Sequence, residues 1–307
     1  MVIRWLKQPK LWITLASLAF IAVALIQQGG QLRQQNLDAR GFCWLLLGLG
    51  LSWGSILVNG LAWRVLLVWL GHLPRQVEVV PLFVRTNLLK YLPGGIWHLV
   101  ERLRVLRPVI GGGPALAAVL LDPLLIAAAA VLLVLVGGWQ NGLILMAPLP
   151  ALLMLPRWRE PILQRLEWGK ADQLEAAGAG DFKDVAGGSG RGGYPWLPLV
   201  WQLAFVICRF LGFYCSVLAF GLQQPDLLVW LAGFALAYAV GLVVPGAPGG
   251  LGVFEATLLL RLGGSVAEAP LLAVVLSYRV ISTVGDLLAS GVLAADQRLM
   301  RRFSASR

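Results

Sequence analysis

The chain has 307 residues, of which 58% are apolar and only 13% are charged. Soluble domains carry about 25% charged residues, so these charges could not cover the surface of a soluble protein of this size. Together with a mean hydropathy of +0.77, this composition predicts a single all-α, multi-pass integral membrane domain over residues 1–307. The net charge of +10 then indicates cytoplasmic loops lying against anionic lipid, and we expect no nucleic-acid partner.

The apolar runs predict six full spans, over residues 11–26, 42–63, 113–137, 142–155, 196–220 and 268–294. Most of these runs are long enough to cross a hydrocarbon core of about 30 Å at about 1.5 Å per residue. The first run follows three basic residues and lacks a small-residue cleavage site, so we interpret it as a retained anchor helix. The fourth run is shorter and contains Pro148 and Pro150.

Two further apolar regions, 79–106 and 226–262, are each interrupted by a Pro-Gly-Gly triplet. Non-helical backbone at membrane depth is tolerated only inside protein or beside a watery cavity, so we expect two re-entrant segments that line a cavity. The N-terminus of the short helix after each break would favour an anion such as a phosphate. A hinge or a packing site without a ligand is the alternative. The triplets are Pro93, Gly94, Gly95 and Pro248, Gly249, Gly250.

The distribution of Lys and Arg predicts the orientation in the membrane. With the N-terminus inside and both triplets re-entrant, the cytoplasmic regions hold 20 of the 25 Lys and Arg residues. These are three before residue 11, seven from Arg64 to Arg107, six from Arg157 to Arg191 and four after residue 297. Positive charge favours the cytoplasmic side, so both termini and the polar stretch 156–195 are predicted there. The second half of that stretch is rich in Gly, Ala and Ser and is predicted to be a flexible linker.

The two halves of the chain show signs of an internal repeat. The triplets lie 155 residues apart, and at the same offset residues 115–126 match residues 270–281 at five of twelve positions. We therefore expect repeat halves at about 42–137 and 196–294, inverted relative to each other by the single span between them. Paired interrupted segments in such repeats indicate a transport site near the midplane.

Five charged residues fall within the predicted membrane segments: Asp122, Arg209, Glu255, Arg279 and Asp286. A charge at the bilayer centre costs about 2.5–3.5 kcal/mol or more, so each is a candidate substrate-binding residue. We expect the two arginines to bind an anionic headgroup, while the carboxylates orient them or relay protons. Arg279 and Asp286 are seven residues apart on one helical face, so they could pair directly or through a partner helix. A purely structural ion pair is the alternative.

Basic residues gather around the first triplet, where they are expected to attract anionic headgroups at the cytoplasmic leaflet. They include Arg85, Lys90, His98 and Arg102. Positive-inside charge alone is the alternative explanation. The two histidines and three cysteines form no metal-ligating or disulfide pattern, so we expect no metal and no cofactor.

The segment PGAPGGLGVFEA at 245–256 resembles the Pro-Gly-Gly-x-Gly-x-x-Glu signature of the lysylphosphatidylglycerol synthase transmembrane region family. The segment KYLPGGIWHLVERLRVL at 90–106 is similar to an earlier Tyr-Leu-Pro-Gly segment of that family. The matching motif residues are Tyr91, Pro93, Gly94, Pro248, Gly249, Gly250, Gly252 and Glu255. The resemblance implies lipid translocation or lipid handling, in a prokaryotic cell (inner) membrane.

The expected function is therefore the translocation of an anionic phospholipid, or of a lipid-linked precursor, between leaflets. Only twelve residues follow residue 295, so we expect no aminoacyl-transferase domain, and without a catalytic motif we expect no enzyme. The alternatives are a secondary transporter of a small anionic solute, a membrane enzyme that modifies a lipid, and a non-transporting assembly partner. A cavity open to lipid would favour the flippase, and a sealed cavity the solute carrier.

Overall fold

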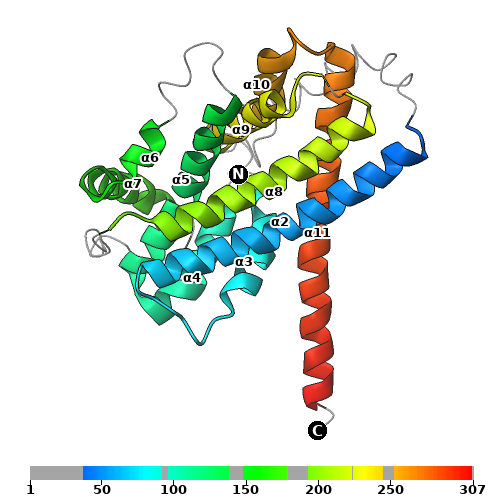
Figure 1. Ribbon diagram of the computed structural model, residues 1–307. Helices are drawn as coiled ribbons and strands as arrows, with labels where there is room; N and C mark the ends of the chain where they lie inside the picture. Colours follow the sequence, from blue (N-terminus) through cyan, green and yellow to red (C-terminus); the bar gives the residue numbers. More distant parts are fainter. Residues whose placement is uncertain are drawn as a thin grey trace, which may run out of the picture.

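The computed structural model describes residues 37–91, 96–137, 148–176, 178, 193–222, 224–244 and 252–305, without the side chains of 167–175 and 296–305. The predicted anchor at 11–26 and both Pro-Gly-Gly triplets lie outside these residues. The described elements are all helices (Figure 1). This agrees with the all-α fold expected from composition.

Four helices in the described part of the chain are long and apolar enough to cross a membrane. They are α2 (Ala39–Trp69), α5 (Gly112–Gly137), α8 (Trp196–Ala219) and the first 28 residues of α11 (Glu268–Ala305). These helices confirm four of the six predicted spans and make the chain an integral membrane protein. In the described part of the predicted span 142–155, the chain forms only the five-residue helix α6 (Leu149–Leu153).

The interrupted regions each have a helix on both sides of the triplet. The first consists of α3 (Val79–Asn87), the 3-10 helix η2 (Leu88–Tyr91) and α4 (Trp97–Ile110). The second consists of α9 (Leu227–Val243) and α10 (Val253–Leu262).

The first half of the predicted polar linker is also helical, as α7 (Pro156–Ala176). This helix differs from the expected polar stretch, although proline at a first helical position and a run of Leu, Glu, Gln, Lys and Ala are typical of helices.

An antiparallel pair of helices, α2 and α8, lies at the centre of the fold (Figure 1). Gly41, near the start of α2, faces the end of α8 at Ala219, and Gly48 faces Gly212 further along. A Cβ atom built on Gly48 would lie 3.0 Å from the carbonyl oxygen of Gly212, so glycine is what allows the two backbones to approach. Close contact through small residues is a common way for membrane helices to pack, because burial away from lipid tails gains little.

The two central helices also end in the same way. Gly71 follows α2 with a φ of +89°, and the next amide, that of His72, donates to the Leu67 carbonyl at 2.9 Å. Gly221 follows α8 with a φ of +68°, and the Leu222 amide donates to the Val217 carbonyl at 3.1 Å. In both cases a glycine in the left-handed region closes the helix and satisfies carbonyls that would otherwise lack donors.

The remaining helices are arranged around this pair in a matching way. Helix α11 packs on α2 as α5 packs on α8, and α11 packs on α3 as α5 packs on α9. Exchanging the two halves of the chain therefore leaves this pattern of helix contacts unchanged.

Aromatic side chains hold the second half together. Phe213 and Phe234 have ring centroids 5.1 Å apart, and both contact Phe254 and Tyr278. This aromatic core joins α8, α9, α10 and α11. Large apolar side chains on the outer faces, such as Leu46 of α2, remain exposed, as expected for helices that contact lipid.

Candidate functional site

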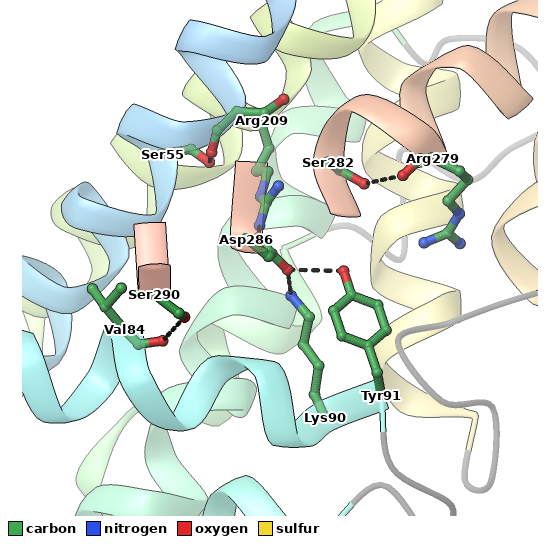
Figure 2. A network of polar contacts seen from close by, with 10 residues as sticks. Ser55, Val84, Lys90, Tyr91, Arg209, Arg279, Ser282, Asp286 and Ser290 are labelled. Atoms are coloured by element: carbon green, nitrogen blue, oxygen red, sulfur yellow. Dashed lines mark hydrogen bonds and ion pairs between the residues drawn. The ribbon is translucent and has the colours of Figure 1, made fainter. Parts of the chain in front are cut away.

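Three donors from two separate elements converge on the carboxylate of Asp286, in the middle of α11 (Figure 2). Lys90 Nζ lies 2.6 Å from Oδ2, and the Tyr91 hydroxyl donates to the same oxygen at 2.8 Å. Arg209 of α8 donates through one terminal nitrogen to Oδ1 at 3.0 Å. Asp286 is 1% exposed, so these donors replace the water that an ionised carboxylate needs. We refer to Lys90, Tyr91, Arg209 and Asp286 as the Asp286 cluster.

The Asp286 cluster holds more positive charge than its carboxylate can balance. Lys90 and Arg209 contribute two cations, whereas Asp286 contributes one anion. Arg209 is 4% exposed, and its Nε has no hydrogen-bond partner within the described structure. A buried charge in a membrane protein is expensive unless it is paired, so the surplus positive charge makes this cluster a candidate anion-binding site.

A second ion pair lies one element away, between α10 and α11. Glu255 accepts through Oε1 from Arg279 Nε, and through Oε2 from the Gly252 amide at 2.6 Å. Glu255 thereby caps its own helix, so the N-terminus of α10 holds a carboxylate of this chain. The Arg279 guanidinium also lies over the ring of Phe254, with its carbon 4.8 Å from the ring centroid.

The two ion-paired groups lie next to the two sequence breaks. Tyr91 is the last described residue before the first triplet, and Gly252 is the first described residue after the second. Helix α11 contributes one residue to each group, Asp286 on the first side and Arg279 on the second. These two residues were expected to pair directly or through a partner helix, but the structure pairs each with a different group, Asp286 with η2 and α8 and Arg279 with α10.

Asp122, the fifth predicted membrane charge, belongs to a separate group. It accepts from Arg102 at 3.4 Å and from the Gln202 amide at 2.8 Å, and Arg102 Nε donates to Thr86 Oγ1 at 3.1 Å. These four residues, the Asp122 cluster, are all buried, and the Arg102 guanidinium lies 3.7 Å from the ring centroid of Phe83. The cluster therefore joins α3, α4, α5 and α8.

The structure does not bring the predicted basic cluster together. Arg85 is exposed, Lys90 belongs to the Asp286 cluster, Arg102 belongs to the Asp122 cluster, and His98 is half-buried in the first turn of α4. Proximity in sequence grouped these residues, but they point in different directions around α3, η2 and α4.

Two residues of these clusters were not expected to bind charged groups. Tyr91 was expected only as a motif residue, and Gln202 was not singled out at all. A polar residue within the apolar run of α8 was the signal for Gln202.

Two surface cavities lie beside these helices. One, of about 350 Å³, is formed by the α2–α3 connection and the end of α4, with His72, Arg75 and Ile110 in its lining. The other, of about 230 Å³, includes Glu78 and Arg85. Neither includes a member of the Asp286 cluster. Among the described residues, no group of three His, Cys, Asp or Glu side chains could hold a metal ion.

The sequence profile of the lysylphosphatidylglycerol synthase transmembrane region matches residues 11–290, which is most of the chain. No curated protein matches the chain closely enough to count as a relative.

Proposed function

Because the chain belongs to the lysylphosphatidylglycerol synthase transmembrane region family, we propose that it moves an anionic phospholipid, or a lipid-linked precursor, between the leaflets of a prokaryotic inner membrane. The family is associated with the handling of membrane lipids. The observation that carries the proposal is the surplus positive charge of the Asp286 cluster, buried between helices long enough to span the membrane. Such a site attracts an anion to a depth that a lipid headgroup must cross.

The proposal places the lipid path between two re-entrant segments of an inverted repeat. Three observations support this arrangement. The central helices α2 and α8 are antiparallel, they end in the same way, and their neighbours occupy equivalent places. The helix starts also follow the offset of 155 residues to within one residue, since α4 begins at Trp97 and α10 at Val253, and α5 begins at Gly112 and α11 at Glu268. Transporters built from inverted repeats bind their substrates at the repeat interface.

In this proposal the protein acts by binding and moving the headgroup, and no catalytic step is assigned to it. Before lipid binds, Arg279 is paired with the Glu255 carboxylate. After release from Glu255, its planar guanidinium binds the lipid phosphate through two N–H groups.

Transport by the purified protein in proteoliposomes tests the proposal. The assay follows fluorescent phosphatidylglycerol across the bilayer, with protein-free liposomes as the background. We expect Glu255→Gln and Arg279→Lys each to slow lipid movement at least tenfold. The first leaves a partly buried guanidinium without its carboxylate, and the second replaces the planar fork by an ammonium group. Asp226→Asn is the matched control, since Asp226 is exposed and its side chain caps no helix amide.

Two outcomes would contradict the proposal. Full transport rates in both variants would place the lipid path away from α10 and α11. A wild-type protein that moves no lipid but imports a soluble anion would be a small-solute carrier instead.

A further inference from the structure

We propose that Lys90, Tyr91 and Arg209 form an anion site which Asp286 fills in the present conformation, and from which the phosphodiester of a lipid displaces it during transport. This inference rests on the proposed function. It adds that the Asp286 carboxylate occupies the binding site while no lipid is bound. It also assigns the site a ligand chemistry, a phosphate group with a single negative charge.

The geometry of the cluster suits this exchange. The donors reach both oxygens of one carboxylate, two on Oδ2 at 2.6 and 2.8 Å and one on Oδ1 at 3.0 Å. A phosphodiester carries the same charge on two non-bridging oxygens and can take the same donors. It also has two ester oxygens, which could accept from the further N–H groups of Lys90 and from Arg209 Nε, the buried donor left without a partner in the described structure.

The charge balance favours a monoanion. The Asp286 cluster and the neighbouring Glu255–Arg279 pair hold three cations and two carboxylates, and Arg279 is close enough to Lys90 to repel it. If the displaced Asp286 carboxylate stays beside these cations on α11, one added negative charge neutralises the group. A phosphomonoester with two charges would reverse the imbalance, and a zwitterionic headgroup would leave it uncorrected.

The position of Asp286 allows a lipid to reach it. The Lys90 side chain keeps 23% of its surface exposed, whereas Asp286 and Arg209 are buried, so the cluster opens on the η2 side. Figure 2 shows Lys90 and Tyr91 extending from η2 towards α11. On the other side of α11, the apolar residues Val280 and Leu287 are exposed, so acyl chains could lie along the helix while the phosphate reaches its inner face.

The experiment measures the binding of dihexanoyl phosphatidylglycerol to the purified chain in neutral detergent micelles by titration calorimetry. Asp286→Asn removes the competing anion and keeps the shape, so this variant should bind the lipid at least tenfold more tightly than the wild type. Asp226→Asn, the same change at an exposed carboxylate, should leave binding unchanged. Adding Lys90→Gln to Asp286→Asn should abolish the gain. An Asp286→Asn protein that binds equally or more weakly would overturn the inference.

Two further ligands identify the occupant. Dihexanoyl phosphatidylcholine should bind the Asp286→Asn protein little or no more tightly than the wild type, because its headgroup adds no net charge. Inorganic phosphate should also gain less than the anionic lipid. A gain for inorganic phosphate alone would overturn the assignment of a lipid phosphodiester.

A second variant keeps the inference testable if Asp286→Asn does not fold. Lys90→Gln leaves Asp286 paired with Arg209, so the cluster is charge-balanced and should remain folded. It should bind the anionic lipid at least tenfold more weakly than the wild type, and unchanged binding would contradict the exchange site. Transport data separate the two proposals. If the wild type moves lipid but Asp286→Asn does not bind it more tightly, only the exchange site is contradicted. If Asp286→Asn binds lipid more tightly but the wild type moves none, only the proposed translocation is contradicted.

Discussion

Arg102 and Asp122 show how a buried pair of charges can serve stability rather than transport. The Arg102 guanidinium lies over the aromatic rings of both Trp63 and Phe83, and its partners Thr86 and Asp122 are buried as well. Every member of this group comes from a different helix, except that Thr86 and Phe83 share α3. Its charges balance one to one, in contrast to the Asp286 cluster. We therefore interpret the Asp122 cluster as a clamp between helices.

Asp122→Asn should reduce the free energy of unfolding by about 3–5 kcal/mol, because it leaves the Arg102 guanidinium buried without a countercharge. Equilibrium unfolding in mixed detergent and sodium dodecyl sulfate micelles measures this loss. Glu101→Gln is the control. It breaks the Arg104–Glu101 pair, in which the Arg104 side chain is 57% exposed, and should change stability by less than about 0.5 kcal/mol. Equal effects of the two substitutions would show that the Asp122 cluster is not a clamp.

At the scale of helices, the sequence predicted which segments form long apolar helices better than it predicted which charged residues pair. The helices α2, α5, α8 and α11 follow from apolar runs, since the thickness of a membrane sets the number of apolar residues that a span needs. Which charges meet depends on how the helices pack, which no single run contains. Lys90 therefore seemed to belong with Arg85, its neighbour in sequence, whereas its partner Asp286 lies 196 positions further along the chain.

Gly212→Leu should separate α2 from α8. A Cβ atom on Gly212 would lie 2.7 Å from Ser52 Oγ and 3.3 Å from the Gly48 carbonyl oxygen, so a larger side chain has no space unless the helices move apart. We expect a loss of about 1–3 kcal/mol in the free energy of unfolding, measured in the same mixed micelles. Gly54→Leu changes a glycine of α2 whose Cβ would meet nothing within 4 Å, and should cost little. A similar loss for both would mean that helix propensity or lipid exposure, not the α2–α8 contact, determines the effect.

At the scale of the whole molecule, the two halves have equivalent helix contacts but very different charges. In the proposed inverted repeat, the antiparallel pair α2 and α8 and the matched places of α5 and α11 would make the scaffold look similar from either side of the membrane. Charge is what distinguishes the sides, since 20 of 25 Lys and Arg residues lie in the predicted cytoplasmic regions.

Reporter fusions after Arg191 and after Arg307 test this orientation. Both should report a cytoplasmic location in an intact cell, using a pair of reporters active on opposite sides of the membrane. Because the second half would have to cross the membrane one more or one fewer time to change the result, an external signal at the C-terminal fusion would contradict the inverted arrangement.

The Asp286 cluster contacts helix α11 at the middle of its length. Asp286 is the nineteenth of its 38 residues, and the C-terminal part of the helix projects away from the other helices (Figure 1). If α11 pivots at Asp286, it acts as a lever with its fulcrum there and two arms of about 28 Å each, at about 1.5 Å per residue. If the proposed exchange tilts α11 by about 10°, each end moves by roughly 5 Å, which is close to one turn of helix. A spectroscopic label at the far end would then report which anion is held at the fulcrum.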